Sequence, residues 1–331
     1  MTHSPWILAP GAPAPCMADN ALFYKRPIPM HASSNTTGRI DWTTLFLLTF
    51  PPLSWAGNAI VGRLAAGTVP PITLNSVRWV LAGLLLAPFA WRGVIEHRAA
   101  LRRHAGVITA LGVLSIASYN ALQYLALTTS TPINVTLIGA STPLFLIVIG
   151  AICFGERVKP WHVAGALLCM VGVTFVLVRG ELGRLAQLDL VAGDLFMLAA
   201  TIAWSGYTWL LRKQRPAVPL PVLLFAQIVT GVLASAPVTA WELMTLDQPL
   251  QWNGKVAAIL LYVATIPSLL AYFAWDRAIA RAGAQLPVFF ITLTPVFAAL
   301  LSTLLLGDWP RWYHAVGLAA IAAGIWLAQR R

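Results

Sequence analysis

Ten apolar segments, each long enough to cross a lipid bilayer as a helix, follow one another along residues 43–329. A helix needs about 20 apolar residues to span a membrane, and a helix satisfies all its backbone amides within its own segment, as lipid requires. We therefore predict an all-α membrane protein with ten transmembrane helices. Their expected bounds are 43–63, 71–91, 106–126, 132–154, 161–179, 191–211, 219–240, 256–276, 284–306 and 312–329.

The composition agrees with this class of protein. Only 10% of the residues are charged, whereas a soluble domain has about 25%. Tryptophans also gather near the segment ends, as interfacial aromatic residues do. These residues are Trp42, Trp91, Trp161, Trp241, Trp252, Trp309, Trp312 and Trp326.

The first 41 residues differ from the rest, because they are rich in Pro, Ala, Ser and Asn and contain no long apolar run. We predict a disordered cytoplasmic tail, since the continuous apolar stretch of a signal peptide is missing. Met17 and Met30 are alternative starts to Met1. The three cysteines show no metal or disulfide spacing, so we expect no metal and no cofactor.

One stretch of the sequence occurs twice in similar form. The stretch TPLFLIVIGAICFGE, which begins at Thr142, returns at Thr294 as TPVFAALLSTLLLGD. The match continues without a gap to Gly172 and Gly324, always at an offset of 152 residues. This register indicates an internal repeat.

A second pair of stretches extends the repeat toward the N-terminus. SWAGNAIVGR (54–63) resembles AWSGYTWLLR (203–212) at an offset of 149 residues. We therefore expect a first copy at 42–180 and a second at 190–331, each with five helices. Because five is odd, the copies must cross the membrane in opposite senses. Inverted repeats of this kind are the architecture of many secondary transporters, whose substrate sites lie between the repeats.

Lys and Arg residues predict the orientation. Sixteen of the 22 fall in the tail and the loops on the side of the N-terminus, five fall on the other side, and Arg78 lies within a segment. The positive-inside rule then places both termini in the cytoplasm. The same distribution explains the net charge of +11 without nucleic acid, because the basic residues are spread over short loops. The expected partners are the lipid bilayer and a small-molecule substrate, with no nucleic acid, and the chain is expected to be a monomer or a homodimer.

Three stretches resemble the EamA family of the drug/metabolite transporter (DMT) superfamily: SWAGNAIVGR, INVTLIGASTPLFLIVIGAICFGE and FFITLTPVFAALLSTLLLGD. The resemblance covers residues 42–329, and the family's second Gly-Glu stands here as Gly307-Asp308. The resemblance implies a ten-helix bundle around a central cavity lined mainly by helices 1, 3, 4, 6, 8 and 9. It also implies a carrier of small metabolites in the inner membrane, often an exporter of amino acids or related compounds.

Arg78 is the one basic residue well inside a segment. A charge at the bilayer centre costs about 2.5–3.5 kcal/mol on insertion scales, so its position needs a reason. One interpretation is that Arg78 snorkels to the outer interface or ties down helix ends. The other is that its guanidinium binds an anionic group of a substrate. At an offset of 149 residues it corresponds to Gln227, so the charge is present in one repeat only.

Polar and aromatic residues on the expected cavity helices complete the candidate site. Tyr119, Asn120 and Gln123 have the spacing of one helical stripe, which we expect to face protein or water. Interhelical packing is the alternative to a cavity wall. The candidate cavity residues are Trp55, Asn58, Arg78, Tyr119, Asn120, Gln123, Asn134, Trp204, Tyr207, Tyr272 and Trp275.

Prolines within the segments predict kinks. Pro51 and Pro52 are expected to bend or break the first helix and free carbonyls for a ligand or water. Pro143 and Pro295 occupy matching places in the two repeats, and paired kinks suit the rocking of one half against the other.

These patterns favour a secondary transporter of small metabolites that works by alternating access, with amino acids or related compounds as the favoured substrates. The alternatives are a channel, which needs a selectivity filter or a charged ring, and a membrane-embedded enzyme. We expect no enzyme and no catalytic residues, because H-E-x-x-H and G-x-S-x-G motifs are absent. The paired His162 and His314 lie at segment starts and are interpreted as structural.

Overall fold

The computed structural model describes residues 41–155, 159–181, 191–245, 252–282, 290–291 and 293–328. Within these residues every regular element is a helix, as the apolar segments predict. The expected tail at 1–41 lies outside the described residues except for Asp41.

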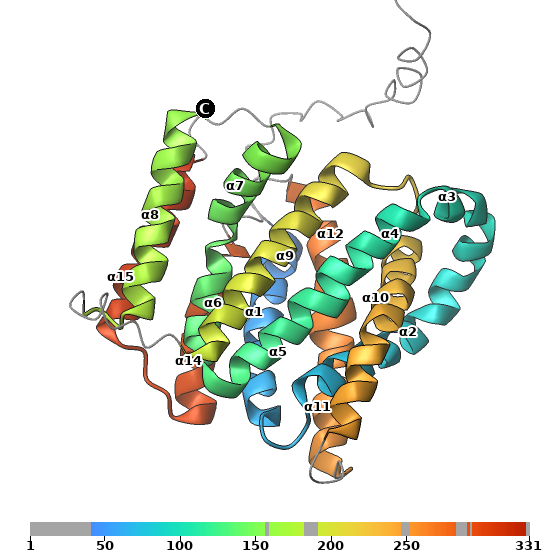
Figure 1. Ribbon diagram of the computed structural model, residues 1–331, viewed down its shortest axis with the longest axis horizontal. Helices are drawn as coiled ribbons and strands as arrows, with labels where there is room; N and C mark the ends of the chain where they lie inside the picture. The colour runs from blue at the N-terminus through green and yellow to red at the C-terminus, as the bar shows by residue number, and fades with distance from the viewer. Residues whose placement is uncertain are drawn as a thin grey trace, which may run out of the picture. The chain divides into compact units, whose positions relative to one another are not determined.

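The helices of the first repeat (Figure 1) are α1 (Trp42–Ala65), α2 (Pro71–Glu96), α3 (Arg98–Arg103), α4 (Ala105–Gly112), the π-helix η1 (Val113–Tyr119), α5 (Asn120–Thr129), α6 (Pro132–Ala140), α7 (Thr142–Phe154) and α8 (Pro160–Leu177). Those of the second are α9 (Ala192–Gln214), α10 (Leu220–Met244), α11 (Gly254–Thr265), the π-helix η3 (Ile266–Leu270), α12 (Ala271–Ala282), α14 (Thr294–Leu306) and α15 (Trp312–Ala328).

Proline and glycine set several of these helix ends. Pro71, Pro132 and Pro160 are the first residues of their helices, where the missing N–H removes no helical hydrogen bond. Gly155 and Gly307 follow α7 and α14 with φ of 63° and 72°, a left-handed conformation that glycine adopts without strain. The two glycines are 152 residues apart, so the repeat extends to the backbone of the helix ends.

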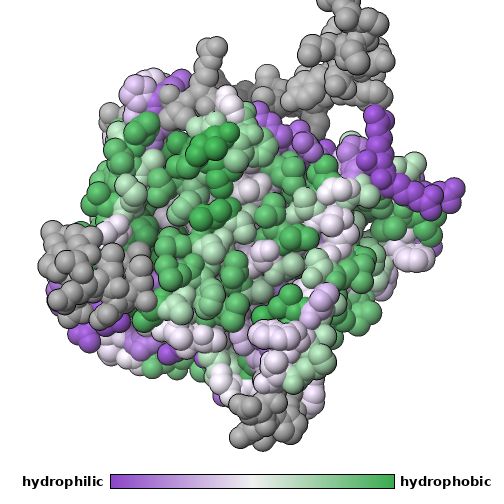
Figure 2. All heavy atoms as spheres, in the orientation of Figure 1, coloured by the Kyte–Doolittle hydropathy of each residue, from purple (hydrophilic) through white to green (hydrophobic). Residues whose placement is uncertain are grey.

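Within the described residues, five helical stretches are long and apolar enough to cross a membrane by themselves: Trp42–Ala65, Pro71–Glu96, Ala105–Thr129, Leu220–Met244 and Gly254–Trp275. The pair α6 and α7, bent by 45°, is a sixth when it is taken as one span. The chain is therefore a multi-pass membrane protein, while the count of ten spans stays a prediction. Figure 2 shows hydrophobic residues over most of one face, with hydrophilic residues near α3 at its edge.

Helices of one repeat pack against helices of the other repeat, and the same contacts occur twice. α1 contacts α12 and α14, while α9 contacts α5 and α7. Since α9 corresponds to α1 in the repeat, and α12 and α14 correspond to α5 and α7, the same contacts are made twice between opposite copies. α2 and α10 pack directly against each other (Figure 1).

The last helices of the repeats, α8 and α15, lie side by side in Figure 1 and meet through glycines. A Cβ on Gly172 would lie 2.8 Å from the Gly317 carbonyl oxygen, and one on Gly324 would lie 2.6 Å from the Gly165 carbonyl oxygen. The later residue on α8 meets the earlier one on α15, so the helices are antiparallel. Gly165 and Gly172 are the repeat counterparts of Gly317 and Gly324, so the contact is reciprocal, as a two-fold axis between repeats requires.

The prolines affect the helices differently from what the sequence indicates. α1 continues through Pro51 and Pro52 as one helix from Trp42 to Ala65, so the helix does not break there, while a bend at these prolines stays a prediction. The prolines leave the Leu47 and Leu48 carbonyls, four residues earlier, without a helical N–H donor.

The other two prolines, Pro143 and Pro295, differ in how much of the chain around them the structure describes. The 45° bend between α6 and α7 falls at residues 141–143, where the sequence predicts a kink at Pro143. Pro295 lies in the first turn of α14, and most of the segment before it, at 283–289 and 292, lies outside the described residues. The gating role of these prolines stays a prediction.

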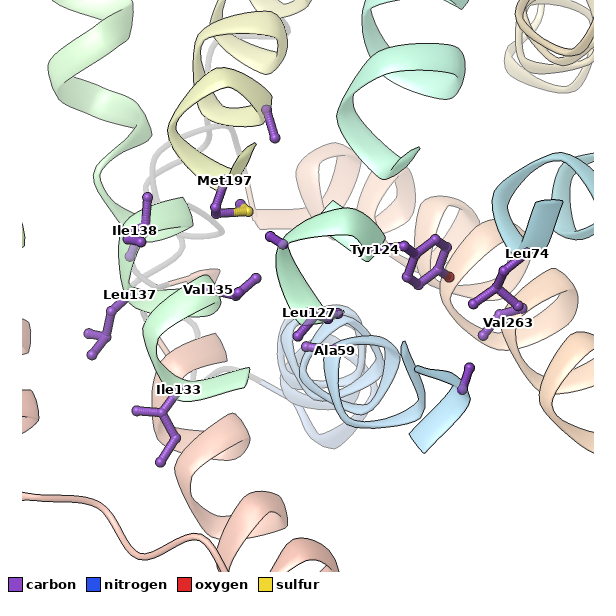
Figure 3. Close-up of a cluster of buried hydrophobic side chains, with 14 of the residues drawn as sticks. Ala59, Leu74, Tyr124, Leu127, Ile133, Val135, Leu137, Ile138, Met197 and Val263 are labelled. Carbon is purple, nitrogen blue, oxygen red and sulfur yellow. The ribbon is translucent and has the colours of Figure 1, made fainter. Parts of the chain in front are cut away.

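A buried hydrophobic cluster joins the helices that surround the polar residues considered next. It includes Ala59 of α1, Leu74 of α2, Tyr124 of α5, Met197 of α9 and Val263 of α11. Figure 3 shows Tyr124 pointing from α5 toward Leu74 and Val263, with its hydroxyl at the tip. This packing fixes the relative positions of helices from both repeats.

Candidate functional site

Arg78 lies inside the bundle, about 10 Å from the start of α2 at 1.5 Å per residue. Its side chain is only 2% exposed, so the interpretation that it snorkels to the interface is wrong. The residue that ties down a helix end is Arg63, whose Nη1 donates to the Leu127 and Thr128 carbonyls at the end of α5, at 2.8 and 2.9 Å. Arg78 instead bonds to side chains of neighbouring helices.

Four neutral oxygens accept hydrogen bonds from the Arg78 guanidinium. Nε donates to the Ser268 hydroxyl of η3 at 2.5 Å. Nη1 donates to Asn58 Oδ1 at 3.3 Å, Asn120 Oδ1 at 3.0 Å and the Tyr124 hydroxyl at 2.8 Å. The first repeat supplies three of these partners and the second repeat supplies Ser268, so the arginine joins the two copies.

The partners of Arg78 also bond to one another. The Tyr124 hydroxyl donates to Asn58 Oδ1 at 2.7 Å, and Asn58 Nδ2 donates to Gln123 Oε1 at 3.1 Å. Asn58, Asn120, Gln123 and Tyr124 are all buried. We call Arg78, these four residues and Ser268 the Arg78 cluster. Because a buried network is costly unless its groups are satisfied, these bonds also hold the side chains in position.

Two π-helices, which the sequence did not predict, shape the cluster. η1 precedes Asn120 and η3 contains Ser268. A π-helix shifts the backbone register and frees carbonyls from the ordinary helical pattern. In η1 the Ser115 carbonyl accepts from Asn120 Nδ2, and the Ile116 carbonyl accepts from Asn75 Nδ2, both at 2.9 Å. The π-turns therefore orient amides at the site.

Beside the cluster, some polar atoms have no partner within the described part of the chain. Trp79 Nε1 and Asn75 Oδ1 are buried there without a hydrogen bond, and Arg78 Nη2 donates none to the described residues. The described residues also provide no carboxylate bonded to Arg78. The site thus holds a positive charge, with one unpaired donor, Trp79 Nε1, and one unpaired acceptor, Asn75 Oδ1, on the same helix.

Aromatic rings form two groups near the cluster. In one, the Trp55 ring centre lies 6.4 Å from that of Tyr272 and 5.7 Å from that of Trp275, and Tyr272 lies 6.4 Å from Trp79. The rings of Trp55, Tyr272 and Trp275 are partly exposed, whereas Trp79 is fully buried. This group links α1, α2 and α12.

The second aromatic group connects a helix of the first repeat with a helix of the second. The Tyr119 and Trp204 ring centres lie 4.9 Å apart, and those of Trp204 and Tyr207 lie 4.8 Å apart. Tyr119 belongs to η1 and the other two to α9. Of the candidate cavity residues, the structure therefore places all but Asn134 in the Arg78 cluster or in these two groups.

Asn134 lies elsewhere, because its Oδ1 is 3.0 Å from His314 Nε2 at the start of α15. The Arg311 backbone N–H donates to His314 Nδ1 at 2.9 Å, so Nε2 carries the ring proton and donates to Asn134. In the first repeat, the Lys159 N–H donates to His162 Nδ1 in the same way, at 3.3 Å. Both histidines thus accept a backbone N–H at the start of their helices, and their structural role stays a prediction.

Acidic residues connect the repeats at the end of the bundle where α2 and α9 begin. The Glu242 carboxylate of α10 accepts from the backbone N–H groups of Ile72 and Thr73, at 3.1 and 2.6 Å. Asp194 of α9 accepts from the Ser130 hydroxyl at 2.6 Å. A carboxylate at a helix N-terminus is stabilised by the helix dipole, so these contacts hold the two repeats together at this end of the bundle.

Comparison with known proteins decides the family. The model of the EamA-like transporter family matches residues 42–178 and again residues 191–329. The chain belongs to the EamA-like transporter family. The two matches show the two-repeat architecture of this family.

Relatives of this EamA-like chain are named as transporters. It is 27% identical to an uncharacterized transporter of Archaeoglobus fulgidus over 86% of this chain and 96% of that protein. It is 25% identical to the aromatic amino acid exporter YddG of Ancylobacter novellus, over 82% and 92%. A probable amino-acid metabolite efflux pump of Salmonella typhimurium is 24% identical, over 85% and 93%. A solved crystal structure shares the fold with a TM-score of 0.56 at 24% identity, covering 87% of this chain and 96% of that one.

The sequence missed some neighbours of the site. Trp79 and Asn75 lie on α2, which was not among the lining helices that the family resemblance implies. Asn75 is three residues before Arg78, a spacing that places two residues on one side of a helix. That spacing, together with the rarity of an arginine inside a span, was the available signal.

Proposed function

We propose that this EamA-like chain is a secondary transporter that moves small metabolites across the inner membrane by alternating access, with amino acids or related compounds as substrates. The observation that carries the proposal is the Arg78 cluster, which takes side chains from α1, α2 and α5 of the first repeat and Ser268 of the second. Secondary transporters bind their substrates between such repeats. The names of the relatives support the substrate class.

The contacts of Glu242 and Asp194 form a closed gate in the proposed cycle. Both residues belong to the second repeat and accept hydrogen bonds from the first. A rocking motion that separates the repeats at this end would break both sets of bonds and open a path to the Arg78 cluster. The bend between α6 and α7 is the proposed hinge, and Pro295 is its counterpart in the second repeat.

Counterflow in proteoliposomes tests the proposal, with a panel of labelled amino acids and small organic anions. We expect saturable exchange, which a channel would not give, and unchanged chemical identity of the substrate, which an enzyme would not give. If the folded and inserted protein exchanges none of the compounds, the proposed substrate class is wrong.

Two asparagine variants test the site. Asn58→Ala removes an amide from the Arg78 cluster, and we expect exchange to fall about tenfold, which corresponds to the loss of about one hydrogen bond to a charged group. Asn134→Ala is the matched control, because it removes the same amide group from a position outside the cluster. Its exchange rate should change about twofold or less. Equal effects of both variants would contradict the site.

The proposed orientation has both termini in the cytoplasm. Arg102→Cys, in α3, should then react with an impermeant maleimide only after the membrane is opened, whereas Lys255→Cys should react in intact spheroplasts. The reverse pattern of labelling would overturn this orientation.

A further inference from the structure

We propose that Arg78 and Trp79 bind the carboxylate of an organic anion, and that a substrate of this site needs a carboxylate but no ammonium group. The inference rests on the proposed transport function and narrows its substrate class to small carboxylates with a flat apolar body. Zwitterionic amino acids would then be accepted for their carboxylate alone.

The first step concerns charge. Arg78 is 2% exposed, and a buried charge is costly unless an opposite charge and hydrogen bonds compensate it. All four of its acceptors are neutral: two amides, a phenol and a hydroxyl. These groups satisfy donors but leave the positive charge uncancelled among the described residues. An anionic ligand would supply the negative charge that these residues lack.

The second step concerns hydrogen bonds. The guanidinium carbon of Arg78 lies 5.0 Å from the centre of the Trp79 ring. Trp79 Nε1 is a buried donor without an acceptor among the described residues, and Arg78 Nη2 donates to none of them. A buried donor without a partner is unfavourable. A carboxylate has two oxygens with about four acceptor sites, so it suits two donors on neighbouring residues.

The third step concerns the rest of the ligand. The polar side chains of the Arg78 cluster other than Arg78 are all uncharged, so no described group of the cluster supplies a negative charge for an ammonium. The aromatic rings of Trp55, Tyr272 and Trp275 are partly exposed and reach Trp79 through Tyr272. Flat apolar groups stack on such rings. The ligand chemistry is therefore a carboxylate joined to a flat apolar body.

Four compounds separate these features in a binding experiment on the purified protein. 3-Phenylpropionate has the carboxylate alone, phenylalanine has both charges, 2-phenylethylamine has the ammonium alone, and 3-phenylpropionamide has neither. The midpoint of thermal unfolding, followed by light scattering, reports binding without transport. We expect the two carboxylates to raise the midpoint, 3-phenylpropionate at least as much as phenylalanine, and the other two to leave it unchanged.

Several results would overturn the inference. One is equal stabilisation by 2-phenylethylamine or 3-phenylpropionamide, and another is stabilisation by phenylalanine but not by 3-phenylpropionate. Equal stabilisation by sodium chloride would assign the charge to an inorganic anion instead. The absence of any effect would show that the site does not bind this class.

Variants connect the effect to the two residues. Arg78→Gln should weaken 3-phenylpropionate binding about tenfold or more, as expected for a charge-assisted bond. Arg63→Gln, which removes an arginine outside the cluster, is the matched control and should retain binding. If Arg78→Gln does not fold, we test Trp79→Phe, which keeps an aromatic ring and removes the indole N–H together with part of the ring. Wild-type affinity in Trp79→Phe would then count against the proposal.

Counterflow distinguishes this inference from the proposed function. A protein that exchanges amino acids but is not stabilised by 3-phenylpropionate contradicts the carboxylate-only requirement and keeps the transport function. If the protein binds 3-phenylpropionate but exchanges nothing, the proposed transport function is wrong and the proposed carboxylate site is retained.

Discussion

The glycine contact between α8 and α15 gives a prediction whose size follows from the structure. A Cβ on Gly172 would lie 2.8 Å from the Gly317 carbonyl oxygen, 3.0 Å from Ala320 Cβ and 3.0 Å from Ile321 Cγ1. Carbon atoms in good contact are about 3.5–4.0 Å apart. Gly172→Ala must therefore move α8 from α15 by about 0.5–1 Å, a gap that loses a quarter to a half of the dispersion energy of the contacts it opens.

The magnitude comes from comparison with a second glycine. Overpacking costs about 1–3 kcal/mol, whereas replacing glycine by alanine within a helix gains about 1 kcal/mol. Gly206 of α9 is the matched control, because a Cβ there would have its nearest contact at 3.7 Å, with Leu114 Cδ1. The helical gain is common to both variants and cancels. We therefore expect Gly172→Ala to be less stable than Gly206→Ala by about 1–3 kcal/mol.

Unfolding by SDS in mixed micelles, followed by far-UV circular dichroism, measures this difference. Gly324→Ala provides a second test, because Gly324 is the repeat counterpart of Gly172 and its Cβ would lie 2.6 Å from the Gly165 carbonyl oxygen. It should lose stability by a similar amount. If Gly172→Ala and Gly206→Ala unfold at the same SDS fraction, the close approach of α8 and α15 does not limit the size of these residues, and the reasoning is refuted.

Two further substitutions test contacts of the site. Tyr124→Phe removes the hydroxyl between Arg78 and Asn58; we expect the free energy of unfolding to fall by about 1–2 kcal/mol, measured by the same SDS titration, and an unchanged value would contradict the network. Glu242→Gln removes the charge from the start of α2, where it bonds to Thr73; the expected loss is about 0.5–1 kcal/mol, together with faster counterflow if this contact opens in each cycle. Slower counterflow at unchanged protein levels would argue against a gate.

Residues near in sequence, and residues related by the repeat, were predictable. Segment length and bilayer thickness dictate helices, and the matched phrases at Thr142 and Thr294 indicate the duplication, which the left-handed Gly155 and Gly307 repeat in the backbone. The rarity of a charge in a span also singles out Arg78. Each of these inferences needs only the local sequence or the comparison of one stretch with another.

The tertiary structure decided what Arg78 does. Its bond to Ser268 joins residues 190 positions apart, and whether those helices meet depends on packing, which no local pattern records. The same holds for Asn134, whose polarity resembles that of Asn58 but whose partner is His314. The π-helices η1 and η3 were also invisible in the sequence, because a shift of hydrogen-bond register by one residue leaves the apolar pattern of a span unchanged. The chain thus encodes its helices and their duplication locally, while the chemistry at Arg78 depends on long-range contacts that form only when the two repeats pack together.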